Sequence, residues 1–191
     1  MPCTRVTPSL RPMREPQRRH SSSPPAASRS VLTPALLRAV RQQFRLDWHG
    51  IHGAPHWARV RANGLAIAAR SGARVDVIEL FAFLHDSCRH SDGGDYQHGR
   101  RAVDFAYALR GDVFDIDNAG FELLAEACST HSNGGLDGEL TVRACWDADR
   151  LDLWRVRITP DPRRLATSEA RLPEVFNAAK KRADVWVGRR W

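Results

Sequence analysis

The chain of 191 residues carries a series of histidine and aspartate residues whose side chains can bind a metal ion. One segment, AFLHDSCRHSDGGDYQHG (residues 82–99), places His85 and Asp86 directly after an apolar run and His98 near its end. Imidazole and carboxylate donors without a CxxC pair are typical of zinc, manganese, iron, cobalt or nickel sites rather than of a structural zinc finger. The candidate ligands beyond residue 30 are His49, His52, His56, His85, Asp86, His90, Asp92, Asp95, His98, His131, Asp147 and Asp149.

The pattern of apolar residues predicts helices that can bring these side chains together. Thr33-Pro34 is typical of a helix start, with a hydroxyl cap and proline in the first position, and Gly72 is a typical helix stop. We expect helices over residues 33–46, 55–72, 75–86, 96–109, 118–130 and 140–153, and a last helix after Pro173. Because no strand-like alternation occurs, the expected fold is all-α, a compact bundle of about six to seven helices.

Composition sets the broad class of the protein. A hydrophobic fraction of 42% suffices for a packed core, and no apolar run is long enough for a transmembrane helix. Four cysteines without a CxxC pair favour a reducing, cytoplasmic setting, although Cys88 lies near the candidate site. Residues 1–30 are rich in Pro, Ser and Arg, so we expect a disordered basic tail there and a helical domain over residues 31–191.

The net charge of +7 is unevenly distributed. Residues 1–30 hold six Arg and one Glu, and residues 163–191 hold eight basic and three acidic side chains, so each end has a net charge of +5. Residues 31–162 hold 15 basic and 18 acidic side chains, a net charge of −3. This distribution argues against nucleic-acid binding as the main role, because a nucleic-acid-binding domain usually has a basic face within the fold.

Five of the expected helices each place a donor at or near an end or in an apolar run. His56 falls in a first turn, His131 at a helix end, and Asp147 inside ACWDADRLDLW. Each of these residues alone has an ordinary explanation, such as a helix cap or, for Asp147, pairing with Arg143 or Arg150 at helical spacing. Together they predict a metal site, because a divalent ion takes donors from several elements.

With these residues in place, the sequence resembles the HD-domain superfamily of metal-dependent phosphohydrolases over roughly residues 47–157. The matching segments are HGAPHWARV with His56, AFLHDS with His85-Asp86, and ACWDADRLDL with Asp147. The resemblance implies that these four residues hold a metal ion. Members with two ions add two histidines, and His98 and His131 stand in the matching places. His56, His85 and Asp147 would then hold one ion, His98 and His131 the other, and Asp86 would bridge them.

The candidate catalytic residues of this segment are Asp86, Arg89 and Asp92. Some one-metal members use an acid soon after the His-Asp doublet to handle water, whereas here Arg89 stands three residues after Asp86. Arginine is suited to holding a phosphate oxygen. Further cations, Arg100 and Arg101, lie nearby in sequence, and His49 or His52 can protonate a leaving group.

The expected function is therefore hydrolysis of a small phosphate ester or nucleotide by a metal-activated water, with one or two ions of manganese, iron, cobalt, nickel or zinc. The GYP signature of cyclic-di-GMP phosphodiesterases is absent from the sequence. Two alternatives stay open: a dinuclear-iron oxygenase of the same superfamily, and a non-catalytic metal-binding helical module. The expected partner is a small phosphorylated molecule rather than a membrane, and the sequence leaves the oligomeric state open.

Overall fold

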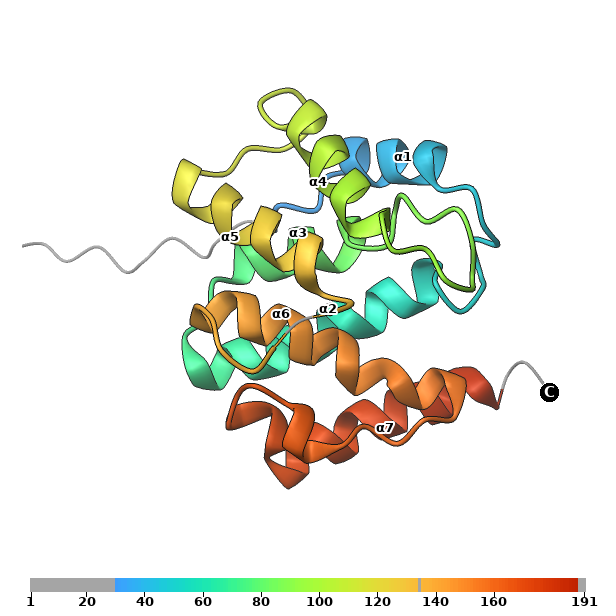
Figure 1. The fold of residues 1–191 in the computed structure, drawn as a ribbon, viewed down its shortest axis with the longest axis vertical. Coiled ribbons are helices and arrows are strands. Elements are labelled where there is room, and N and C mark those ends of the chain that lie inside the picture. The colour runs from blue at the N-terminus through green and yellow to red at the C-terminus, as the bar shows by residue number, and fades with distance from the viewer. Residues whose placement is uncertain (1–29, 134, 189–191) are drawn as a thin grey trace, which may run out of the picture.

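The computed structural model describes residues 30–133 and 135–188, and these residues form seven α-helices, three short 3-10 helices and no β-strand (Figure 1). The α-helices are α1 (Pro34–Gln43), α2 (Ala54–Ser71), α3 (Val75–Leu84), α4 (His98–Leu109), α5 (Asn118–Thr130), α6 (Leu140–Arg150) and α7 (Pro173–Val187). The 3-10 helices are η1 (Leu151–Val156), η2 (Pro162–Arg164) and η3 (Glu169–Arg171). The expected all-α fold is confirmed. The tail expected over residues 1–30 lies, apart from Ser30, outside the described residues.

Local signals in the sequence account for several helix ends. The Thr33 hydroxyl accepts a hydrogen bond from the Leu36 amide at 3.1 Å, and Pro34 occupies the first helical position. Gly72 ends α2 in the left-handed conformation with φ of 79°. Helix α3 is nearly all apolar, and its side chains from Val77 to Leu84 are buried except for Phe83. A helix with this composition belongs in the centre of a bundle.

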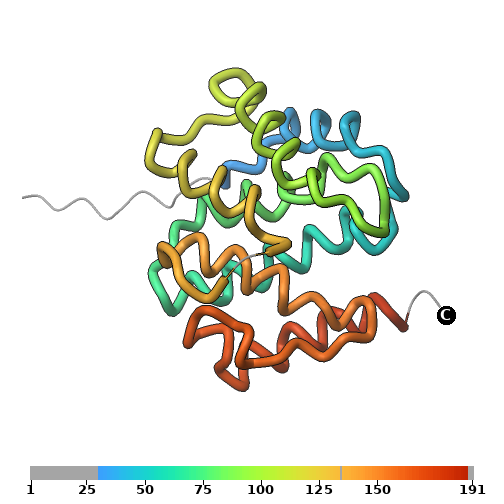
Figure 2. Tube along the Cα trace, viewed as in Figure 1, coloured from blue at the N-terminus to red at the C-terminus, as the bar shows by residue number. Residues whose placement is uncertain are grey.

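The arrangement of the helices puts α2 and α3 in the middle of the molecule. Helix α2 packs against α3, α6 and α7, while α3 also contacts α5, which in turn contacts α4. Figures 1 and 2 show α1 and α4 along one side of the molecule and α7 along the opposite side. Within the part of the chain that the structure describes, every helix is too short or too polar to cross a membrane.

Two glycines allow pairs of helices to approach closely. A Cβ atom on Gly64 of α2 would lie 2.5 Å from Ile78 Cγ2 of α3, and one on Gly99 of α4 would lie 2.3 Å from the Cys128 carbonyl oxygen of α5. Both distances are far below the van der Waals contact of about 3.5–4.0 Å. The absence of a side chain at these positions therefore sets the spacing between α2 and α3 and between α4 and α5.

We expect Gly99→Ala to separate α4 from α5 and to lower stability by about 1–3 kcal/mol, the usual cost of overpacking. Alanine is a better helix former than glycine by about 1 kcal/mol, so a loss of stability must come from the contact with Cys128. Thermal unfolding measures the effect, with Arg100→Ala at the exposed neighbouring position as the control. A Gly99→Ala protein as stable as the Arg100→Ala protein would show that α4 and α5 can move apart without lowering the free energy of unfolding.

Candidate metal centre

Six donor side chains from five helices meet in the interior of the bundle. They are His56 in the first turn of α2, His85 and Asp86 directly after α3, His98 at the start of α4, His131 directly after α5, and Asp149 in the last turn of α6. All except Asp149 are buried, and the Asp149 side chain is 20% exposed. The sequence analysis predicted five of these six residues as metal ligands. Two overlapping sets of three could hold a metal ion: His56, His85 and Asp149, and His85, Asp86 and His131.

The first donor group consists of His56, His85 and Asp149, with one oxygen of Asp86 beside them. His56 Nε2 lies 3.2 Å from His85 Nε2 and 3.4 Å from Asp149 Oδ1. Asp86 Oδ2 lies 3.6 Å from the Nε2 atom of each histidine. Four donors placed tetrahedrally about 2.1 Å from one ion are about 3.4 Å apart, so these distances suit a bound divalent ion.

The second donor group lies on the other side of the Asp86 carboxylate. His98 Nε2 is 2.8 Å from His131 Nε2, and Asp86 Oδ1 lies 3.2 Å from the former and 3.6 Å from the latter. Asp86 thus turns Oδ2 toward one pair of histidines and Oδ1 toward the other. A carboxylate in this position can contribute one oxygen to each of two donor groups.

Hydrogen bonds at the far ring nitrogen orient all four imidazoles. In each ring Nδ1 faces an acceptor, which leaves the lone pair of Nε2 directed at the donor groups. The acceptors are Asp152 Oδ2 for His56 at 2.7 Å, the Phe81 carbonyl for His85 at 3.0 Å, the Cys128 carbonyl for His131 at 2.8 Å, and the Asp95 carbonyl for His98. Within each donor group two Nε2 lone pairs then face one another at short range, an arrangement that a cation between them stabilises.

The protonation of His56, His85, Asp86 and Asp149 suits a metal ion, whereas the hydrogen bond and charge of Asp86 outweigh burial and raise the pKa of His131. Burial lowers the pKa of His56 well below its usual value and the pKa of His85 to about 4. Burial alone would raise the pKa of Asp86, but the imidazoles of His85 and His131 hold it well below its usual range. Neighbouring imidazoles likewise outweigh burial and lower the pKa of Asp149. Neutral imidazoles and ionised carboxylates are the forms that bind divalent metals.

The prediction of Asp147 as a metal ligand is wrong, and Asp149 takes that place. Asp147 accepts hydrogen bonds from the amides of Ala166 at 2.8 Å and Thr167 at 2.7 Å, and from the Thr167 hydroxyl at 2.7 Å. Two residues along a helix correspond to a rotation of about 200°, so Asp147 and Asp149 lie on nearly opposite faces of α6. Asp147 is buried because it anchors the segment after η2, not because it faces the donor groups.

Of the two predicted catalytic residues that are not themselves donors, Arg89 and Asp92, Arg89 contacts the donor groups. Its Nη1 is 3.2 Å from Asp86 Oδ1 and 3.2 Å from His98 Nε2. Its other two nitrogens donate to backbone carbonyls, Nε to Ser91 at 3.2 Å and Nη2 to Gly93 at 3.0 Å. The guanidinium is therefore fixed by the loop after α3 and directs one N–H edge at the candidate centre.

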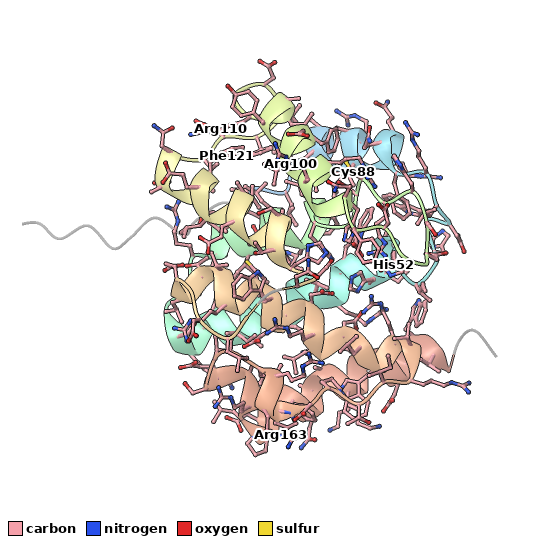
Figure 3. All side chains as sticks on the ribbon, in the orientation of Figure 1. His52, Cys88, Arg100, Arg110, Phe121 and Arg163 are labelled. Carbon is pink, nitrogen blue, oxygen red and sulfur yellow. The ribbon has the colours of Figure 1, made fainter. Side chains whose placement is uncertain are left out.

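Asp92, the third predicted catalytic residue, contacts a histidine rather than the donor groups. Its Oδ1 lies 2.7 Å from Nδ1 of His52, a largely buried residue in the loop before α2 (labelled in Figure 3). Burial lowers the pKa of His52, while Asp86 and Asp92 act in the opposite direction. Asp92 therefore orients His52, which stands near the first donor group, with ring centroids of His52 and His56 6.4 Å apart.

Asp152 contacts the first donor group, and the sequence analysis did not include it among the candidates. It accepts from His56 Nδ1 at 2.7 Å and from Arg59 Nε at 2.6 Å, and it is fully buried. A carboxylate behind a metal-binding histidine fixes the ring and raises its basicity as a ligand. The signal was present in the sequence, because Asp152 follows Asp149 by one helical turn and therefore shares its face.

The other candidates have structural roles or lie apart. Asp95 pairs with Arg101 at 2.5 Å, and Arg101 also donates to the Cys88 carbonyl. Burial raises the pKa of the Cys88 thiol, so this cysteine lacks the character of a reactive thiolate. Neither donor group that the described residues form includes His49 or His90. Arg100 is exposed on α4.

A cavity of about 670 Å³ adjoins the candidate centre. Its lining includes one residue from each donor group, Asp149 and His131, and extends over α6, η1 and η2 to Arg150, Leu153, Asp161 and Arg164. This volume is within the range of about 300–1,000 Å³ for small-molecule sites. The cavity therefore gives a small ligand access to the donors.

Comparison with protein-family models, with curated proteins and with solved structures finds no match for this chain. The likeness to the HD-domain superfamily therefore rests on the residues and their spacing alone.

Proposed function

We propose that this protein is a metal-dependent phosphohydrolase with two divalent transition-metal ions, one in each donor group, bridged by Asp86. The observation that carries the proposal is the position of Arg89, whose Nη1 lies 3.2 Å from a donor atom of both Asp86 and His98. A fixed guanidinium beside a histidine and carboxylate centre favours an anionic substrate, because it pairs with the oxygens of a phosphoryl group. A phosphate ester is the substrate that matches this combination.

The donor set suits the chemistry of phosphate ester hydrolysis. Divalent ions held by these imidazoles and carboxylates would lower the pKa of a bound water to about 7, which would make hydroxide available at neutral pH. Asp152 and the backbone carbonyls behind the histidines keep the rings directed at the centre. Burial of the donors excludes bulk water and strengthens each of these electrostatic contacts.

Arg89 and His52 have separate roles in the proposed reaction. Arg89 stabilises the negative charge that develops on the phosphoryl oxygens, since backbone carbonyls hold its guanidinium in place. His52, oriented by Asp92, is the residue that transfers a proton to or from the reacting oxygens.

The test is a panel of phosphate esters and nucleotides assayed with manganese, cobalt, nickel, iron and zinc, together with metal analysis of the purified protein. We expect phosphate release that depends on the added metal and is abolished by a chelator. Two irons per chain with a mixed-valence signal and no phosphate release would indicate an oxygenase instead. Absence of bound metal and of any activity would indicate a non-catalytic module.

We expect Arg89→Gln to lower kcat/KM for phosphate esters by about 10²–10³-fold, as removal of a charge-stabilising donor does. Metal content should stay unchanged, because Arg89 is not a metal ligand. Arg100→Gln, on the exposed surface of α4, is the matched control and should keep full activity. Equal kcat/KM values for the two variants would exclude Arg89 from the reaction.

A further inference from the structure

Arg150 donates hydrogen bonds to two of the chain segments that line the cavity beside the candidate centre. Arg150 Nη1 donates to the Arg164 carbonyl at 2.9 Å, and Nη2 donates to the Gly135 carbonyl at 3.1 Å. The segment after α5 and the segment around η2 are therefore both tied to the last turn of α6, which also carries Asp149. The last turn of α6 therefore contributes both the donor Asp149 and the arginine that connects two segments of the cavity wall.

The charged residues that line the cavity differ in whether their side chains already have a hydrogen-bond or ion-pair partner. The Arg150 guanidinium binds backbone carbonyls, and Asp161 pairs with Arg163 at 2.9 Å. Arg164 is also a lining residue of the cavity; its side chain is exposed and makes no hydrogen bond and no ion pair with any other described residue. Arg164 is therefore a cation in the cavity wall that is available to a ligand.

We propose that Arg164 recognises a second anionic group on the substrate, at the end away from the phosphate that is hydrolysed. This inference rests on the proposed function, which assigns the reacting phosphate to the donor groups and Arg89. His131, Asp149 and Arg164 all line this cavity, so a ligand bound in it can extend from the centre toward Arg164. A guanidinium binds phosphate or carboxylate through two parallel hydrogen bonds. The substrate class is thus a small phosphate ester that carries a further phosphate or carboxylate.

Arg163 provides a matched control within the same turn of η2. It is adjacent in sequence and 90% exposed, it pairs with Asp161, and it is not part of the cavity lining (labelled in Figure 3). Substitution of Arg163 by glutamine changes the charge of the protein and of the η2 turn by the same amount as substitution of Arg164. Any effect of the surface charge alone would appear equally in both variants.

The experiment compares α,ω-alkanediol bisphosphates of three to six carbons with the monophosphates of the same diols. We expect a KM lower for the best bisphosphate than for its monophosphate by about tenfold or more, as one charge-assisted contact gives. Arg164→Gln should abolish this preference, whereas Arg163→Gln should preserve it. Equal KM values for the two esters in the unmodified protein, or a preference that survives in Arg164→Gln, would overturn the inference.

A failure of the proposed function is distinguishable from a failure of this inference. If neither ester is hydrolysed with any metal, the proposed hydrolysis is wrong, and equilibrium binding of the same esters to the metal-loaded protein decides the role of Arg164. Tighter binding of the bisphosphate that is lost in Arg164→Gln would support the anion subsite. Equal binding of both esters, or a preference unaffected by Arg164→Gln, would refute it.

Discussion

Asp86→Ala is expected to lose both metal ions and to lower kcat/KM by more than about 10³-fold. Removal of a residue that only orients a metal ligand already costs about 10–100-fold, and Asp86 is itself a proposed ligand. The physical reason is that its two carboxylate oxygens face different pairs of histidines, at 3.6 Å for Oδ2 and 3.2–3.6 Å for Oδ1. Among the possible metal ligands of the described residues, His85 also belongs to both candidate groups, but Asp86 is placed between the two pairs of histidines with one oxygen toward each pair. Metal analysis after gel filtration measures the number of ions per chain.

Asp92→Ala is the control for this experiment, because Asp92 is an acid in the same region that contacts His52 and neither donor group. It should retain the metal content of the unmodified protein. Circular dichroism should show the same helix content in both variants. One ion retained in Asp86→Ala would show that Asp86 serves a single donor group, and two ions retained would refute the donor assignment.

Asp147→Ala and Asp149→Ala are expected to have opposite effects, although the two residues are separated by one position. Asp147→Ala leaves two buried amides and a hydroxyl of residues 166–167 without their acceptor and should cost about 3 kcal/mol or more. For a chain of this size that corresponds to a fall in Tm of about 10 °C. Asp149→Ala should leave Tm of the metal-depleted protein nearly unchanged, because no backbone amide of the described residues donates a hydrogen bond to this side chain.

The two substitutions should affect the metal content in the opposite order to their effects on Tm. Asp149→Ala removes a donor that lies 3.4 Å from His56 Nε2 and should reduce the bound metal to one ion per chain. Asp147→Ala should keep two ions when it is measured well below its Tm. Loss of metal in Asp147→Ala together with retention in Asp149→Ala would restore the assignment that the sequence suggested.

The fold and most of the site were predictable because they depend on local signals. The Thr33-Pro34 start, the Gly72 stop and the apolar composition of α3 follow from capping and burial, and the structure has each of them. The histidines of the donor groups lie at helix ends. An error of one or two residues in a predicted helix boundary therefore still leaves each histidine at the same end of the same helix. The proposed two-ion arrangement goes beyond these observations and stays a prediction.

The choice between Asp147 and Asp149 could not be made from the sequence. Both residues fall in the same run, ACWDADRLDLW, and differ by about 200° around the helix. The apolar surroundings that favoured Asp147 arise from the later segment at Ala166 and Thr167, whose path across α6 no local pattern reveals. The cavity and the position of Arg164 depend on the same long-range packing.

The orientation of the four histidines has a consequence for how the centre tolerates mutation. Three of the rings are fixed by main-chain carbonyls, those of Phe81, Cys128 and Asp95, and a main-chain carbonyl survives almost any substitution at its residue. Only His56 depends on a side chain, that of Asp152. Substitutions in the surrounding sequence therefore leave the orientation of three of the four donor rings unchanged, whereas a substitution at position 152 removes the acceptor that orients His56.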